Sequence, residues 1–267
     1  MTSNGNRIVG STAVVLIVCL VAYRFMHRGG LPAIQNGSTK AGGQTYIPSL
    51  ALLKRGNPAL KEVALTIDDG PHPKYVPKIL RVLREDQTHA TFFVVGKKVL
   101  EHPEFVRQML ADGHNVGNHS MTHPRFITLS PDDVRKEIAG CAQAVFKATG
   151  TKMTLVRPPG LRYTSDILKI DKEMHYITVE ENIAVGDFIV VGDFSWYPNS
   201  PTYPKHVADI QRNVFKQLKN GAIIVLHDMP ATADALDNII KGIHERGYTI
   251  VTIPEMLAHL PNPVVQP

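Results

Sequence analysis

Two short stretches of the chain carry residues that are suited to metal chemistry. GHNVGNHSMTHP holds His119 and His123 four residues apart, and LTIDDGPHP holds Asp68 directly before Asp69. One carboxylate and two imidazoles can bind a divalent metal ion and leave coordination positions open for water and substrate. Two histidines in a polar turn can also be hydrogen-bonded and inert, but a carboxylate pair at the end of a separate strand disfavours that interpretation. Together the two stretches predict one metal site.

The two aspartates are expected to differ in role, because neighbouring residues of a strand point to opposite faces. One carboxylate can bind the ion while the other faces a water molecule. A metal ion lowers the pKa of such a water toward neutrality, and a carboxylate beside it can act as general base. A plain DDGP turn would explain Gly70 and Pro71, but not a carboxylate pair directly after the apolar run VALTI.

Three further residues could complete a hydrolytic site. Hydrolysis of an amide needs an acid, because an amine anion is a very poor leaving group, and a histidine such as His227 in IIVLHDM titrates near neutral pH. Arg157 offers a permanent cation that can orient a carboxylate, and the backbone N–H of Gly160 can face a developing oxyanion. Each also has a plain structural interpretation: His227 ends a strand, Arg157 forms a surface ion pair, and Gly160 makes a turn.

The elements that must position these residues alternate between strand and helix from Glu62 onward. The expected strands are VALTI, ATFFVVG, HNVGNHS, TLVRPPG, FIVVG, AIIVLHD and YTIVTI. The expected helices are YVPKILRVLRED, PEFVRQMLADG, SPDDVRKEIAGCAQAVFKATG, HVADIQRNVFKQLKNG, ALDNIIKGIHERG and PEMLAHL, the third with Ser130 as N-cap and Gly150 at its end. This alternation predicts an α/β fold with parallel strands, either an open sheet or a barrel.

The candidate residues follow the ends of the expected strands. Asp68 and Asp69 end the first strand, His119 the third, Arg157 the fourth, and His227 the strand AIIVLHD. In parallel α/β folds the active groups lie at the carboxyl ends of the strands. Polar side chains from separate segments are therefore expected to meet in one cleft.

This set of motifs resembles the polysaccharide deacetylase family, also called carbohydrate esterase family 4 or the NodB-homology domain. The resemblance covers about residues 61–260, with the motifs in the family's order. They are Thr66-Ile67-Asp68-Asp69-Gly70 for T-F-D-D-G, His119-Ser120-Met121-Thr122-His123 for H-[ST]-x-x-H, Arg157-Pro158-Pro159 for R-x-P, and Val225-Leu226-His227-Asp228 for the apolar-L-H-D strand.

The resemblance implies a distorted (β/α) barrel and a divalent metal ion held by Asp69, His119 and His123. The implied ion is most often Zn²⁺, with Co²⁺, Ni²⁺ or Mn²⁺ as alternatives. The implied reaction is hydrolysis of N-acetyl groups, less often O-acetyl groups, on N-acetylhexosamines of a cell-envelope polysaccharide such as peptidoglycan or a chitin-like glycan.

The resemblance also implies roles for the other candidates. Asp68 would be the base, His227 the acid, and Arg157 the residue that orients Asp68. The implied substrate-binding positions are Pro159, Gly160 through its backbone N–H, Trp196 and Leu226.

The sequence departs from the family pattern at three places. An isoleucine replaces the Phe of the first motif, and Gly160 stands where a Tyr commonly follows R-P-P. The fourth motif, often D-x-x-D-W, corresponds here to VVGDFSWYP, in which Ser195 precedes Trp196 and the nearest acid is Asp193. We expect Trp196 to line the acetyl pocket and Asp193 to act behind Arg157.

The N-terminal segment favours a membrane anchor. The uncharged run IVGSTAVVLIVCLVAY lies between two arginines, and no small-residue cleavage site follows it. We therefore expect the protein in the cell envelope with its catalytic domain outside the cytoplasm, or secreted if the segment is cleaved. The expected organisation is an anchor or signal segment over 1–28 with membrane contact through 8–26, a flexible linker over 29–60, the catalytic domain over 61–260 and a tail over 261–267.

The composition of the chain argues against several other classes of partner and structural support. The net charge of +5 comes without an arginine-rich run or a basic-aromatic face, so nucleic acid is not an expected partner. Only Cys19 and Cys141 are present, which excludes an internal disulfide framework. The length of 267 residues suffices for a sizeable core, so a metal ion is not required merely for folding.

Other functions that use these residue types stay open. A degenerate module would keep the fold and the metal and bind glycan without turnover. A deacetylase or deformylase of a lipid-linked sugar would use the same chemistry. A facial-triad iron oxygenase leaves the aspartate pair and His227 without a role, and a zincin protease is disfavoured because Ser120 stands where H-E-x-x-H requires Glu.

Overall fold

The structure, a computed structural model, describes residues 52–187 and 197–261. These residues belong to one compact unit that spans 42–267. The expected anchor over 8–26 lies outside the described ranges. Within them, no helix is long and apolar enough to cross a membrane.

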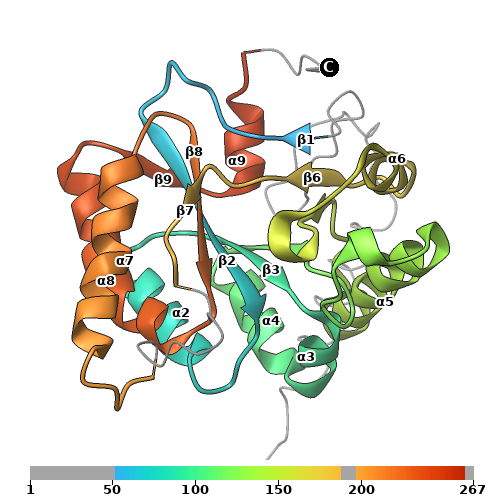
Figure 1. Cartoon of the computed structure of the whole chain (residues 1–267), viewed down its shortest axis with the longest axis horizontal. Helices are drawn as coiled ribbons and strands as arrows, with labels where there is room; N and C mark the ends of the chain where they lie inside the picture. The colour runs from blue at the N-terminus through green and yellow to red at the C-terminus, as the bar shows by residue number, and fades with distance from the viewer. Residues whose placement is uncertain (1–51, 188–196, 262–267) are drawn as a thin grey trace, which may run out of the picture. The chain divides into compact units, whose positions relative to one another are not determined.

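A single sheet of parallel strands dominates the described ranges and curls into an open half-barrel (Figure 1). The strand order is β1-β6-β5-β4-β3-β2-β8-β7, and β9 also pairs with β2. The predicted α/β fold of the distorted-barrel type is confirmed, whereas the predicted strand FIVVG lies outside the described residues. The strands are β1 (Leu52–Leu53), β2 (Glu62–Gly70), β3 (Thr91–Val94), β4 (Asn115–Asn118), β5 (Leu155–Val156), β6 (Ile177–Val179), β7 (Ile183–Ala184), β8 (Ala222–His227) and β9 (Thr249–Val251).

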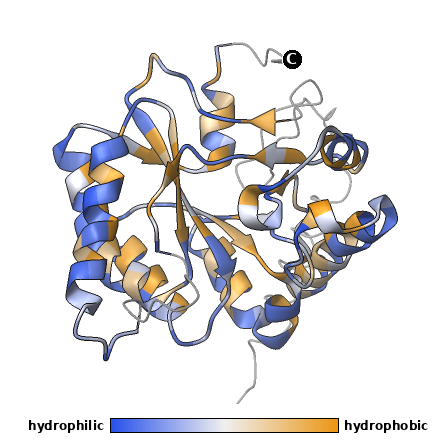
Figure 2. Cartoon of the chain, in the orientation of Figure 1, coloured by the Kyte–Doolittle hydropathy of each residue, from blue (hydrophilic) through white to orange (hydrophobic). Residues whose placement is uncertain are grey.

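Helices follow most strands and cover the outer face of the sheet (Figures 1 and 2). The helix that was predicted with a cap at each end begins after Ser130, whose hydroxyl accepts a hydrogen bond from the Asp133 N–H. It ends at Gly150, which has a left-handed backbone conformation with a φ of 73°. The helices are α2 (Val76–Glu85), α3 (Gly96–Glu101), α4 (Pro103–Ala111), α5 (Pro131–Thr149), α6 (Ser165–Glu173), α7 (Tyr203–Gln217), α8 (Pro230–Glu245) and α9 (Ile253–Ala258), with 3₁₀ turns over Phe126–Thr128 and Pro159–Leu161.

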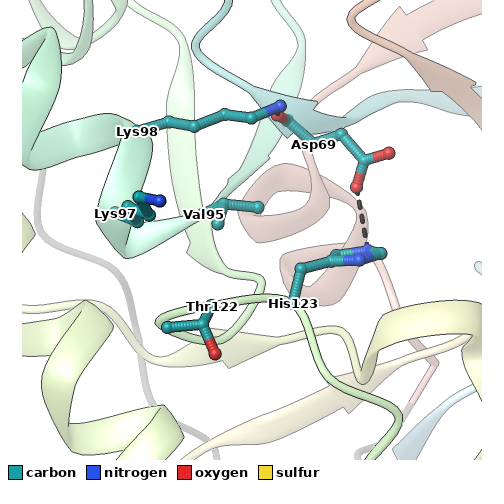
Figure 3. A pocket seen from close by; sticks show the side chains of 6 residues that line it. All are labelled: Asp69, Val95, Lys97, Lys98, Thr122 and His123. Atoms are coloured by element: carbon teal, nitrogen blue, oxygen red, sulfur yellow. Dashed lines mark hydrogen bonds and ion pairs between the residues drawn. The ribbon is translucent and has the colours of Figure 1, made fainter.

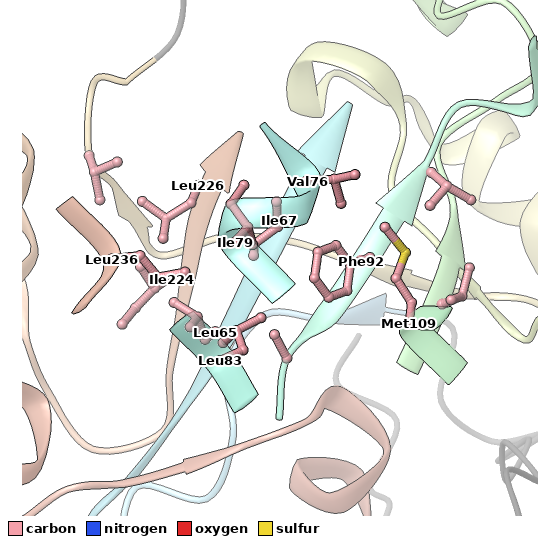
Figure 4. Close-up of a cluster of buried hydrophobic side chains, with 14 of the residues drawn as sticks. Leu65, Ile67, Val76, Ile79, Leu83, Phe92, Met109, Ile224, Leu226 and Leu236 are labelled. Atoms are coloured by element: carbon pink, nitrogen blue, oxygen red, sulfur yellow. The ribbon is translucent and has the colours of Figure 1, made fainter. Parts of the chain in front are cut away.

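Strand β2 is buried on both faces. Val63, Leu65 and Ile67 pack in the large core between the sheet and the helices, whereas Ala64 packs in a second core inside the half-barrel (Figure 4). Because side chains alternate along a strand, Asp68 continues the inward-facing row. The alternation of side chains along β2 therefore directs the Asp68 carboxylate toward the inside of the half-barrel.

Strand β8 repeats this arrangement beside β2. Ile224 and Leu226 pack in the large core, whereas Ile223 packs inside the half-barrel. His227 lies directly opposite Asp68 in the parallel register, so it belongs to the same inward-facing row.

The amino end of the half-barrel is closed by α9, which lies opposite the arrowheads of β2 and β8 in Figure 1. Met256 and Leu257 of α9 belong to the inner core together with Phe93 and Ile223. Because apolar side chains fill the amino end of the half-barrel, the polar side chains lie at the other end, where the strands finish.

Several short elements were not expected from the sequence. They are α3, α6, β6, β7 and β1, and β1 lies inside the range expected as a linker. Leu53 of β1 is buried and pairs with Val179 of β6.

Candidate active site

The predicted residues meet at the carboxyl ends of the strands. Asp68 and Asp69 lie just before the end of β2, and His227 is the last residue of β8. His119 directly follows β4, and Arg157 directly follows β5. The structure brings these separate segments together at one end of the sheet, and their roles in a shared site stay a prediction.

Asp69, His119 and His123 form a compact cluster of metal-ligand types. The Asp69 Oδ1 atom lies 3.3 Å from His119 Nε2. It also lies 3.0 Å from His123 Nε2, the contact drawn as a dashed line in Figure 3. One ligand atom from each residue lies within 4.8 Å of the other two. These three side chains could hold one divalent cation.

The backbone at this cluster adopts conformations that side chains normally avoid. Asp69, Ser120 and His123 have φ values of 69°, 68° and 65°, three of the six positive-φ positions other than glycine in the described residues. Such conformations cost on the order of 1 kcal/mol each and persist where surrounding contacts enforce them. The left-handed conformation of Asp69 lets its side chain leave the helix-facing row of Val63, Leu65 and Ile67 and face the two imidazoles.

Hydrogen bonds hold the loop that carries the imidazoles. The Asn118 side chain is fully buried, accepts from the Ser120 N–H at 2.9 Å and donates to the Ile138 carbonyl at 2.8 Å. The Ser120 hydroxyl in turn accepts from the His123 N–H at 2.8 Å. Glu137 accepts from both the backbone and the hydroxyl of Thr122.

The donor chemistry of the cluster fits a divalent cation. His119 Nδ1 lies 2.7 Å from the Arg157 carbonyl oxygen, so it donates its hydrogen there and leaves Nε2 as a lone-pair ligand. Asp69 Oδ1 is buried without a conventional hydrogen bond. Burial raises the pKa of Asp69, but the close contacts with His119 and His123 and the charges of His119 and His227 outweigh burial and hold this pKa well below its usual range. The carboxylate is therefore ionised and ready to bind a cation.

Asp68 is held by a fully buried arginine. Arg157 Nη1 donates to Asp68 Oδ1 at 2.7 Å and to the Thr66 hydroxyl at 2.8 Å. The guanidinium carbon lies 4.2 Å from the centre of the Phe93 ring, and Nε donates to the Val179 carbonyl. Arg157 is thus not the surface ion pair of the plain interpretation.

His227 has a buried carboxylate behind it. Its Nδ1 lies 2.8 Å from Asp187 Oδ1, and its backbone N–H donates to Asp187 Oδ2 at 2.6 Å. The Thr232 hydroxyl also donates to Asp187 Oδ2. Burial lowers the pKa of His227, but the charge and hydrogen bond of Asp187, together with Asp68 and Asp69, raise it to about 9. The imidazole is therefore protonated at neutral pH.

Asp187 is the site residue that the sequence analysis missed. Asp193, which was predicted to act behind Arg157, lies outside the described residues, as does Trp196, so both assignments stay predictions. The run Val-Gly-Asp-Phe occurs twice, over 185–188 and 191–194, and the prediction favoured the copy nearer the tryptophan. The duplicated run was the available signal, because two aspartates in the same local sequence were equal candidates.

The remaining predicted substrate positions lie near Arg157 and His227. Gly160 is exposed and has a φ of 67°, a left-handed conformation that favours glycine. Pro159 is buried, and Leu226 is fully buried in the large core directly before His227 (Figure 4). Contact of these residues with substrate stays a prediction.

Comparison with known proteins supplies an independent line of support. The family model described as polysaccharide deacetylase matches residues 55–179. Peptidoglycan-N-acetylmuramic acid deacetylase PdaA of Bacillus subtilis is 33% identical over 204 residues, which are 76% of this chain and 73% of that protein. The solved structure of PdaA has a TM-score of 0.68 to this chain and covers 79% of it, with 86% of the PdaA chain matched.

Two further proteins are also similar. A peptidoglycan-N-acetylglucosamine deacetylase of Bacillus cereus is 32% identical over 204 residues, which are 74% of this chain and 89% of that protein. The crystal structure of a CE4 family pseudoenzyme from Bacillus anthracis has a TM-score of 0.69 at 28% identity, covering 78% of this chain and 69% of that one.

Proposed function

Because the chain belongs to the polysaccharide deacetylase family, we propose that it hydrolyses the acetamido groups of N-acetylhexosamine residues in peptidoglycan. Relatives are named as deacetylases of N-acetylmuramic acid and of N-acetylglucosamine, so both sugars of that glycan are candidate substrates. The observation that carries the proposal is the meeting of Asp69, His119 and His123, with Asp68 beside them.

We assign the metal site to Asp69, His119 and His123. One carboxylate and two imidazoles suit Zn²⁺, and Co²⁺, Ni²⁺ and Mn²⁺ accept the same ligand types. When bound, the cation supplies Lewis acidity, which polarises the acetyl carbonyl and lowers the pKa of a water molecule.

Asp68 is assigned as the base. Its Oδ1 is occupied by Arg157, whereas its Oδ2 lies 3.9 Å from His119 Nε2 and therefore faces the ligand cluster. Arg157 orients the carboxylate through a charge-assisted hydrogen bond. Asp68 accepts one proton from the attacking water as the water oxygen bonds to the carbonyl carbon.

His227 is assigned as the acid. Its Nδ1 is bonded to Asp187, so proton transfer to the leaving nitrogen falls to Nε2. As the C–N bond breaks, this proton goes to the sugar nitrogen, and the products are acetate and a free amine. The backbone N–H of Gly160 is assigned to the developing oxyanion, and Pro159, Leu226 and Trp196 to the acetyl pocket.

We further propose that the domain acts outside the cytoplasm. The uncharged run over 8–23 supports attachment of the chain to a membrane, and peptidoglycan is the substrate named for relatives. Detection of the full chain in membrane or secreted fractions, with protease access to the domain in intact cells, tests this proposal.

The catalytic assignment is tested by acetate release. The full chain loaded with Zn²⁺ should release acetate from peptidoglycan glycan strands, and Asp68→Asn should lower kcat by at least about 10²-fold because the general base is removed. Asp166→Asn, which neutralises an exposed carboxylate on α6, is the matched control. Acetate release by Asp68→Asn at the rate of the control would exclude Asp68 as the base.

A glycan-binding module without turnover is the second candidate, because a similar structure is that of a CE4 family pseudoenzyme. It predicts glycan binding without acetate release at any metal loading. Against it, this chain keeps the three ligand-type residues together with the Asp68–Arg157 and His227–Asp187 pairs. Deacetylation of a lipid-linked sugar uses the same residues, and a panel of acetylated glycans and glycolipids distinguishes it.

A further inference from the structure

A cavity lies beside the proposed metal ligands and has no role in the chemistry described above. It has a volume of about 240 Å³. Asp69 and His123 belong to both the ligand cluster and the cavity, so a group that enters the cavity lies next to the reacting sugar (Figure 3). The lining residues are Asp69, Val95, Lys97, Lys98, Thr122 and His123.

The backbone at the start of α3, which carries the two lysines, is bonded to the loop that carries the imidazoles. The backbone N–H of Gly96 donates to the Ser120 carbonyl at 2.9 Å, and that of Lys97 donates to the Met121 carbonyl at 2.8 Å. These bonds join the start of α3 to the loop that carries the imidazoles. The backbone that carries Lys97 and the loop that carries the imidazoles are therefore directly bonded to each other.

The cavity wall has an excess of positive charge. Lys98 Nζ donates to the Asp69 carbonyl oxygen at 2.6 Å, a contact that orients the ammonium without neutralising it. Lys97 lies beside Val95 and has no described carboxylate within 4.0 Å (Figure 3). Asp69 is the only carboxylate of the lining, and its side chain is directed at the imidazoles.

We propose that this cavity binds a carboxylate carried by the sugar whose acetamido group is hydrolysed, such as the lactyl ether of N-acetylmuramic acid. The inference rests on the proposed function and names its preferred substrate. An ammonium–carboxylate contact is a charge-assisted hydrogen bond, which a neutral hexosamine cannot offer to Lys97. The cavity volume of about 240 Å³ is many times the roughly 10–15 Å³ that holds one water on the same measure, which leaves room for a three-carbon acid.

The test compares two glycans that differ only in charge. One is a tetrasaccharide of alternating N-acetylglucosamine and N-acetylmuramic acid with free lactyl carboxylates, and the other carries the same carboxylates as methyl amides. For the full Zn²⁺-loaded chain, both kcat/KM for acetate release and the Kd from calorimetry are measured. The wild-type protein should favour the carboxylate form, and added salt should reduce the preference.

The variants separate this role from general folding. Lys97→Gln should lower the preference for the carboxylate form by about fivefold or more, which is the effect of losing one charge-assisted contact. Lys97→Arg should retain most of the preference. Lys147→Gln removes another exposed lysine, from α5, and should leave the preference at the wild-type value.

The outcomes distinguish this inference from the proposed function. Absence of acetate release from both glycans would reject the function, and the binding measurement would still decide the cavity's role. Tighter binding of the carboxylate form that is lost in Lys97→Gln supports the inference in either case. Equal affinity and equal kcat/KM for the two forms, or the same preference in Lys97→Gln as in wild type, overturns it.

Discussion

Asp187 controls the proton that His227 would deliver. Burial alone would lower the pKa of the imidazole, but the buried carboxylate opposes this effect by its charge and its hydrogen bond, and the pKa rises to about 9. At neutral pH the imidazole therefore carries its proton. As the pH rises through about 9 the proton is lost, so the rate should fall over that range.

Replacement of Asp187 should move this alkaline limit. In Asp187→Asn the charge that raises the pKa of His227 is gone, so the fall in kcat should begin at a lower pH than in wild type. A pH profile of kcat for acetate release measures the change, with Asp166→Asn as the surface control. An alkaline limit that stays at the wild-type pH would contradict the link between Asp187 and the acid.

At the level of elements, the site depends on the close approach of α3 to the metal-ligand loop and to α5. A Cβ on Gly96 would lie 2.5 Å from the Met121 sulfur and 2.8 Å from the Cys141 Cα. The Cα belongs to the backbone of α5 and cannot rotate away. Only glycine therefore permits the two backbone hydrogen bonds between α3 and the loop.

Gly96→Ala should accordingly destabilise the protein by about 1–3 kcal/mol, the usual cost of overpacking a core. The cost arises from sterics alone, because Gly96 does not have a positive φ. Gly150→Ala is a suitable comparison, since a Cβ there meets nothing within 4 Å and only the φ of 73° opposes it. Chemical denaturation measures both variants. If Gly96→Ala were as stable as wild type, the close approach would not constrain the fold.

The elements with a strong periodic pattern were predictable from the sequence. VALTI, AIIVLHD and the capped helix α5 are present as expected, because their apolar spacing and end residues agree. α3 has six residues and β7 has two, which is too short for a period to appear. These elements form through contacts with neighbours that are remote in the sequence.

The candidate site was predictable to a similar extent. The motifs identify residues that lie on strand ends, and the structure brings those residues together. Asp187 was not identified, because its partner His227 is 40 residues away and nothing in a linear pattern selects one of two identical Val-Gly-Asp-Phe runs.

In the molecule as a whole, the proposed metal site joins two distant strand ends. Asp69 belongs to β2, whereas both imidazoles follow β4. A ligand that binds only the folded arrangement shifts the unfolding equilibrium toward the native state. Metal binding should therefore be visible as stability of the entire domain, independently of catalysis.

Zn²⁺ at about 100 times its Kd should stabilise the full chain by about 2.7 kcal/mol. The increase in Tm should disappear with a chelator and in His119→Ala, which loses one ligand. His244→Ala removes an exposed imidazole at the end of α8 and should respond to Zn²⁺ as the wild type does. A Tm unaffected by Zn²⁺, Co²⁺, Ni²⁺ and Mn²⁺ would contradict the assignment of the ligands.

The pairing of β2 with both β8 and β9 also has a consequence for biosynthesis. The strand that carries Asp68 and Asp69 is translated before β3 to β7, and its neighbours β8 and β9 follow only after all of these strands have been made. Contacts between such remote segments slow folding, and an unpaired strand edge invites aggregation meanwhile. Chains that stop before residue 222 therefore lack both the partner strand of β2 and His227, the proposed acid.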